Sequence, residues 1–213
     1  ESRIEESLAL LGLSPASIDI VLMTHMHHDH SGGLTYVNEQ GELVSKYPNA
    51  KIIVNDVEWY EMRNPNNRTR GTYLRENWEP IQEQVTLYSE YINVIPEIQM
   101  IRTSGHSNGH SIVLLKQGED TMIHMGDLML THVHRNPLWV PAVDDYPMKS
   151  ILAKDKWLRQ AFENHYKFFF YHDQFFAVAE FDKEGKEFVD YVLRSRPPLI
   201  PFTDKQDRKP DFL

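Results

Sequence analysis

The chain has 213 residues, of which 41% are hydrophobic, and a formal net charge of −9 at pH 7. The acidic balance argues against nucleic-acid binding, and no apolar run approaches the roughly 18–20 residues of a membrane span. With no cysteines, the chain has no disulfides, and metal ligands must be nitrogen or oxygen atoms. We expect a single domain over residues 1–213, in which about 197–213 form a surface tail. A cytoplasmic location is the default expectation. Because the chain begins at Glu1 and not at a methionine, removal of a leader peptide is the alternative.

Hydrophobic spacing predicts short strands interspersed with helices. Residues 2–13 place apolar side chains on one helical face, and the apolar run 18–23 predicts a buried strand. Residues 51–55 predict another strand and 56–63 a helix, followed by a loop by composition over 64–78. Later in the chain we expect a helix around 148–165 and strands at 98–102, 111–116, 121–125, 167–171 and 175–181. The sequence therefore predicts an α/β or α+β layered fold with functional loops at one edge of the sheets.

The segment THMHHDHSGG, residues 24–33, packs four histidines and an aspartate into six positions. Three other predicted strands also end at such residues, leading into SGHSNGH (104–110), Gly126-Asp127 and His172-Asp173. Strand ends are rigid platforms, and a metal site needs ligands fixed to within tenths of an ångström. Neutral imidazole and carboxylate together suit Zn²⁺, or Mn²⁺, Co²⁺ and Fe²⁺. The pattern predicts a metal site.

The ordered blocks H-x-H-x-D-H, G-H-S-x-G-H, G-D and a late histidine resemble the metallo-β-lactamase superfamily from residue 25 to about 181. This resemblance implies an α+β fold, an αββα sandwich, and two divalent metal ions, zinc by default. One ion would be bound by His25, His27 and His106, the second by Asp29, His30 and His172, with Asp127 bridging both. Histidine at position 27, where flavodiiron relatives have glutamate, favours hydrolysis over oxygen chemistry.

Some of these assignments have a second interpretation. In the G-H-S-x-G-H block, the family pattern makes His106 the ligand. His110 is the alternative ligand, and if it is not the ligand we expect it to support the site or to pack in the core. The alternative for Asp127 is an ordinary aspartate in a turn. The last ligand is either His172, which we favour, or Asp173. His28 is expected to point away from the metals.

The candidate substrate pocket rests on weaker signals. His132 and His134 follow Asp127 in a loop and either line the pocket or lie on the surface. Trp59 and Trp78 belong to aromatic clusters that form either an apolar substrate wall or part of the core.

Within the superfamily, the chain is similar to the N-acyl homoserine lactonase and methyl-parathion-hydrolase-like branch. The similarity lies in EMRNPNNRTRGTYLRENWEPI (61–81), SGHSNGH, GDLMLTHVHRNPLW (126–139) and FFFYHDQ (168–174). It implies opening of a lactone ring by water activated between two metals. Asp29 would be the catalytic carboxylate that orients this nucleophile, and a homodimer is possible by analogy. The alternatives are a phosphotriesterase, a thioesterase of the glyoxalase II kind, or a metal-binding fragment without activity.

Two departures from the family pattern matter. Leu130 stands where some relatives have a tyrosine that hydrogen-bonds the lactone carbonyl. Only 24 residues precede His25, where the family has several strands, so we expect an N-terminally truncated chain that lacks part of the first sheet.

Overall fold

The computed structural model describes residues 4–194, so the tail expected at about 197–213 lies outside the described residues. The α-helices are α1 (Ile4–Ala9), α2 (His28–Ser31), α3 (Asp56–Arg63) and α4 (Pro147–Glu163). Short 3-10 helices are η1 (Pro15–Ser17), η2 (Thr69–Gly71), η3 (Arg75–Asn77), η4 (Glu79–Gln84), η5 (Gly126–Met129) and η6 (His132–Arg135). The strands are β1 (Ile20–Leu22), β2 (Thr35–Val37), β3 (Leu43–Ser45), β4 (Lys51–Asn55), β5 (Val85–Tyr88), β6 (Tyr91–Ile95), β7 (Ile98–Arg102), β8 (Ser111–Gln117), β9 (Asp120–His124), β10 (Lys167–Phe169), β11 (Phe176–Phe181) and β12 (Phe188–Leu193).

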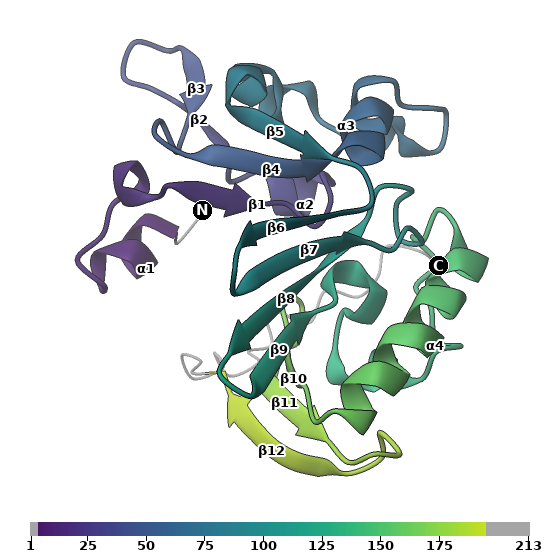
Figure 1. The fold of residues 1–213 in the computed structure, drawn as a ribbon. Coiled ribbons are helices and arrows are strands. Elements are labelled where there is room, and N and C mark those ends of the chain that lie inside the picture. The colour runs from purple at the N-terminus through teal and green to yellow at the C-terminus, as the bar shows by residue number, and fades with distance from the viewer. Residues whose placement is uncertain (1–3, 195–213) are drawn as a thin grey trace, which may run out of the picture.

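The described strands form two main sheets and one hairpin (Figure 1). The first sheet has the order β1-β4-β5, with all strands parallel. The second has the order β12-β11-β10-β9-β8-β7-β6 and is antiparallel except where β10 pairs with β9. Strands β2 and β3 form the separate hairpin. Since β9 and β10 are parallel neighbours, their carboxyl ends lie at the same edge of the second sheet.

Strand β4 shows how the sequence builds the layers. Its side chains alternate between two faces, as the pleat requires. Ile52 and Val54 are fully buried and pack in a cluster with Trp59 and Met62 of α3. Ile53, between them, packs in another cluster with residues of β5, β7 and β8. Helix α3 therefore covers one face of the first sheet, and the second sheet covers the other.

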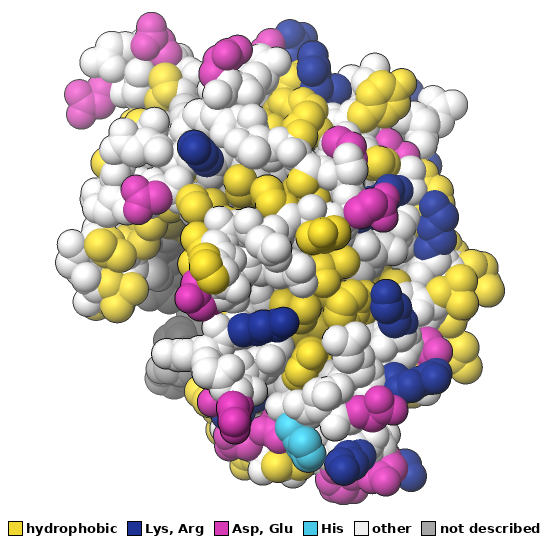
Figure 2. Space-filling model, viewed as in Figure 1, with side chains coloured by type: hydrophobic (Ala, Val, Ile, Leu, Met, Phe, Trp, Pro, Cys, Tyr) yellow, Lys and Arg dark blue, Asp and Glu magenta, His cyan; other side chains and the backbone are white. Residues whose placement is uncertain are grey.

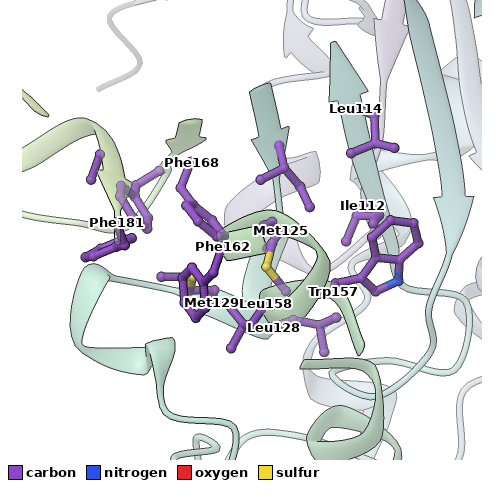
Figure 3. Close-up of a cluster of buried hydrophobic side chains, with 14 residues drawn as sticks. Ile112, Leu114, Met125, Leu128, Met129, Trp157, Leu158, Phe162, Phe168 and Phe181 are labelled. Carbon is purple, nitrogen blue, oxygen red and sulfur yellow. The ribbon is translucent and has the colours of Figure 1, made fainter. Parts of the chain in front are cut away.

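The largest buried cluster lies between the second sheet and helix α4 (Figure 3). Trp157, Leu158 and Phe162 of α4 pack in it with Phe168 of β10 and Phe181 of β11. Fully burying one such side chain contributes about 1.5–3 kcal/mol. The order of layers is thus helix, sheet, sheet, helix, and the predicted α+β fold is confirmed.

Several short elements were not predicted. The hairpin β2–β3 has three-residue strands, too short for a periodic signal, and β5 and β6 follow a stretch that composition marks as irregular. The predicted helix over 2–13 is shorter, ending at Ala9, and Leu10 and Leu11 are exposed. None of the described helices combines the length and apolar character needed to cross a bilayer. Acidic and basic side chains are interspersed over the face in Figure 2, with apolar surface between them.

Candidate metal centre

The predicted ligands all lie just beyond the ends of strands. They come from the segment that runs from the end of β1 through α2, the loop between β7 and β8, helix η5 after β9, and the turn after β10. In that order, these segments supply His25, His27, Asp29 and His30, then His106, then Asp127, then His172. Segments far apart in the chain therefore meet at one place.

These side chains form two groups, and the ligand atoms in each lie within 4.8 Å of one another. The first ligand group is His25, His27 and His106, and all three are buried. The second ligand group is Asp29, His30, Asp127 and His172, in which Asp29 is exposed. Imidazole nitrogens face each other within each group. His27 Nδ1 lies 3.0 Å from His106 Nε2, and His30 Nε2 lies 3.2 Å from His172 Nε2.

Asp127 lies between the two groups. Its Oδ2 is 3.4 Å from His106 Nε2 and 3.9 Å from His25 Nε2. Its Oδ1 is 3.2 Å from His30 Nε2 and 3.3 Å from His172 Nε2. Burial alone would raise the pKa of Asp127, but the imidazoles of His172 and His30 hold it below its usual range. The carboxylate is therefore ionised and turns one oxygen towards each group.

Electrostatics favour neutral imidazoles at His25 and His27 of the first ligand group. Burial and then the neighbouring imidazole of His30 lower the pKa of His25, and burial lowers that of His27 to about 3. Burial also acts to lower the pKa of His106, but its hydrogen bond to Asp144 and the charges of Asp127 and Asp144 together outweigh burial and raise the pKa. Metal ions bind the neutral form of imidazole, so His25 and His27 need no deprotonation near neutral pH.

The residues present fit a pair of divalent ions. His25 Nε2 is buried and has no hydrogen-bond partner among the described residues, although buried polar atoms nearly always have one. Among the same residues, the buried His27 Nε2 and Asp127 Oδ1 also have no hydrogen-bond partner. An ion in each group would satisfy these atoms, and histidine nitrogen with carboxylate oxygen is a donor set that suits zinc.

His110 supports Asp127 and is not in either ligand group. Its Nε2 accepts the backbone N–H of Asp127 at 3.1 Å, so its Nδ1 carries the proton and donates to Thr103 Oγ1 at 2.9 Å. Burial lowers the pKa of His110 well below its usual value, which keeps it neutral. Gly126 has φ +51°, and a Cβ there would lie 2.5 Å from His110 Nε2. The turn before Asp127 therefore requires glycine.

Asp144 was not found by sequence reasoning. It is buried, and its Oδ1 accepts a hydrogen bond from His106 Nδ1 at 2.9 Å, which leaves His106 Nε2 free for a metal. Arg68 holds this segment by donating to the Asp144 carbonyl at 2.9 Å and to Asp145 Oδ1 at 2.6 Å. Asp144 is 38 residues from His106, and no local pattern marks it.

Asp173, the alternative last ligand, has a supporting position. Its Oδ2 accepts the backbone N–H of His132 at 2.7 Å and His132 Nδ1–H at 2.6 Å. Its Oδ1 accepts the backbone N–H groups of Phe175 and Phe176. Asp173 therefore ties the segment after Asp127 to the turn that carries His172.

The predicted pocket residues have varied surroundings. Trp59 is buried in the cluster beneath α3, and Trp78 packs against that cluster, so both contribute to the core, the other role considered for them. Leu130 is partly buried after η5, and His134 Nδ1 lies 2.9 Å from Thr131 Oγ1.

His28 is exposed, as expected for a side chain that points away from the metals. A cavity of about 760 Å³ borders the second ligand group, and its lining includes Asp29, His30, Tyr171 and Arg194. That volume is in the range of small-molecule sites.

Comparison with known proteins agrees with this geometry. The family model described as the metallo-beta-lactamase superfamily matches residues 1–192. An N-acyl homoserine lactonase from Bacillus cereus is 28% identical over 123 residues, 58% of this chain and 43% of that protein. A hydroxyacylglutathione hydrolase from Prochlorococcus marinus is 26% identical over 115 residues, 54% of this chain and 37% of that protein. The chain thus spans about two fifths of the length of these curated relatives.

Solved structures show the same fold. A probable metal-dependent hydrolase from Staphylococcus aureus has a TM-score of 0.87 at 38% identity, over 92% of this chain and 70% of that one. A dizinc quorum-quenching lactonase has a TM-score of 0.75 at 19% identity, over the same shares, which shows a likeness of fold alone. With the family match spanning the ligand-bearing segments and the two ligand groups assembled as the motif order predicts, the chain belongs to the metallo-β-lactamase superfamily.

Proposed function

We propose that this chain is a dinuclear metal-dependent hydrolase that opens the lactone ring of N-acyl homoserine lactones. The observation that carries the proposal is the placement of Asp127, whose two oxygens face two separate ligand groups. Two divalent ions in such a site, zinc in our proposal, supply Lewis acidity and activate water at neutral pH.

The side chains of the second ligand group have distinct tasks in this proposal. Asp127 sets the separation of the two groups, whereas Asp29 is available to the substrate side because its side chain is 45% exposed. Its Oδ2 lies 3.5 Å from His30 Nε2 and 3.6 Å from His172 Nε2. From there Asp29 accepts a hydrogen bond from the attacking water and orients it. Tyr171 donates its hydroxyl to the Asp29 carbonyl at 3.0 Å and so holds the backbone of this residue.

Two observations favour a lactone as the substrate. Named relatives at 26–28% identity are N-acyl homoserine lactonases, and the cavity beside Asp29 and His30 offers room for a small molecule. Leu130 offers no hydrogen bond to a substrate carbonyl, so we expect weaker carbonyl recognition than in relatives with a tyrosine there. The hydroxyacylglutathione hydrolase relative makes a thioester the second candidate substrate.

The test is ring opening of a long-chain N-acyl homoserine lactone by zinc-loaded protein, beside a sample treated with chelator. Chelator-sensitive opening supports the proposal. Parallel assays with a thioester and a phosphotriester at equal concentration rank the alternatives by kcat/KM. If two ions bind per chain and none of the three substrates is hydrolysed, the chain is a metal-binding fragment without this activity, and the proposal is wrong.

A further inference from the structure

Glu58, on helix α3, is a buried carboxylate with three donors. The residue has no exposed surface. Its Oε1 accepts the backbone N–H of Met26 at 2.8 Å and the hydroxyl of Tyr73 at 3.0 Å. Its Oε2 accepts the hydroxyl of Ser107 at 2.5 Å. Nothing in the motif analysis singles out this residue, which is one of several acidic residues in DVEWYEMR.

The donors belong to the segments that carry the first ligand group. Met26 lies between His25 and His27, and Ser107 directly follows His106. These two segments are about 80 residues apart in the chain, since His27 and His106 differ by 79 positions. One carboxylate therefore holds both segments at a fixed separation. The third donor also contacts the site, because the Tyr73 ring lies 5.2 Å from the His27 ring.

Helix α3 is itself fixed in place. The Asn55 side chain caps its first turn by accepting the N–H of Val57, and it donates to the Tyr88 carbonyl at 3.0 Å. On the other side, the loop of Ser107 lies directly on the helix. A Cβ at Gly109 would lie 2.1 Å from the Glu58 backbone nitrogen, so glycine is required for this approach. Glu58 thus reaches the two segments from a rigid support.

We propose that Glu58 is a positioning residue for the first metal, which sets the spacing between the His25–His27 turn and the His106 loop. Burying a carboxyl group is costly unless it is hydrogen-bonded, so the three aligned donors around Glu58 point to a geometric task. Supporting partners of metal ligands typically change metal affinity by 10- to 100-fold when they are removed. This inference rests on the metal-binding part of the proposed function and needs no particular substrate.

The experiment measures zinc affinity by competition with a chromogenic chelator, and the visible spectrum of the Co²⁺-loaded protein. Glu58→Ala should lower the affinity for the tighter-bound ion by 10- to 100-fold and shift the Co²⁺ spectrum. Glu58→Gln should restore most of the affinity, because its amide oxygen still accepts from Met26 and Tyr73 and Ser107 can turn to accept its N–H. Asp56→Ala is the matched control. Asp56 lies on the same helix and accepts from Ser89 and Val57, outside both segments.

Wild-type affinity and spectrum in Glu58→Ala would overturn the inference, as would an equal loss in Asp56→Ala or no rescue by Glu58→Gln. Should Glu58→Ala fail to fold, Ser107→Ala replaces it, since this change removes one donor and leaves the carboxylate in place. Ser107→Ala should weaken zinc binding, and unchanged binding would contradict the inference. A wild-type protein that binds no metal refutes the proposed function instead, whereas a metal-binding protein without lactonase activity leaves this test intact.

Discussion

The two ligand groups differ in burial and in support. In the first, the side chains of His25 and His106 are 0% and 2% exposed. Two buried carboxylates support this group: Asp144 accepts a hydrogen bond from His106, and Glu58 accepts the backbone N–H of Met26. In the second, the side chains of Asp29 and His172 are 45% and 30% exposed. If both groups bind ions as we propose, we expect the buried first group to retain its ion more tightly and the exposed second group to be open to exchange and to substrate.

Asp127 faces both groups, one with each oxygen, so its removal should have the largest effect. Asp127→Ala deletes the carboxylate that faces His106 with one oxygen and His30 with the other. We expect metal content to fall towards one ion or none per chain, and hydrolytic turnover to be abolished. Metal analysis of the purified variant and the lactone assay measure these outcomes. Retention of two ions with full turnover would show that the halves do not share this residue.

Chelation should separate the two halves. Because the second ligand group is the more exposed, we expect a dilute chelator to remove one ion in a fast phase and the other in a slower phase. Stopped-flow absorbance with a chromogenic chelator measures both phases. His172→Ala should lose the fast phase alone, since it removes a ligand of the second group only. Release of two ions per chain in a single phase would contradict the expected difference in exchange between the two groups. A fast phase that persists in His172→Ala would contradict it as well.

The sequence predicts the ligands but not what holds them. His25, His27, Asp29 and His30 are separated by short, fixed spacings, so a local motif identifies them. Strand β4 and helix α3 were likewise predicted within their observed bounds, because an unbroken apolar run ends at Asn55, a side chain that caps a helix.

The supporting residues are found only in the fold. Glu58 and Asp144 contact segments 32 to 49 positions away, and each looks like an ordinary surface acid in its local sequence. Tertiary contacts, not local periodicity, decide their burial. The same reason explains Trp59, whose aromatic cluster fits a pocket wall or a core equally well until its neighbours are known.

Acid pH should destabilise the buried side of the centre. Burial lowers the pKa of His110 well below its usual 6.5, so the folded metal-free protein keeps it neutral while the unfolded chain takes up a proton. Above about pH 6.5 this difference in proton uptake does not change the free energy of unfolding. Below about pH 6.5, proton uptake by His110 in the unfolded chain lowers the free energy of unfolding by up to about 1.4 kcal/mol per pH unit. His110→Gln keeps an acceptor for the Asp127 N–H and cannot titrate. Urea unfolding at pH 7.5 and 5.5 should therefore show a smaller loss in the variant, by about 1 kcal/mol. An equal loss would mean that His110 does not contribute to the pH dependence.

The smallest effect is expected at His28, which lies in the densest part of the histidine motif. Its side chain is exposed, and its backbone N–H donates to the Thr72 carbonyl regardless of the side chain. His28→Ala should change the free energy of unfolding by less than about 0.5 kcal/mol and leave metal content and turnover unchanged. His30→Ala, two positions later on the same short helix, should lose an ion, because its Nε2 faces Asp127 and His172. Metal analysis and lactone assays of the two variants show whether the loss of an ion depends on the direction of the histidine side chain or on the loss of any histidine from this segment. Equal metal loss in both variants would mean that the helix, and not the ligand geometry, accounts for the difference between the two halves.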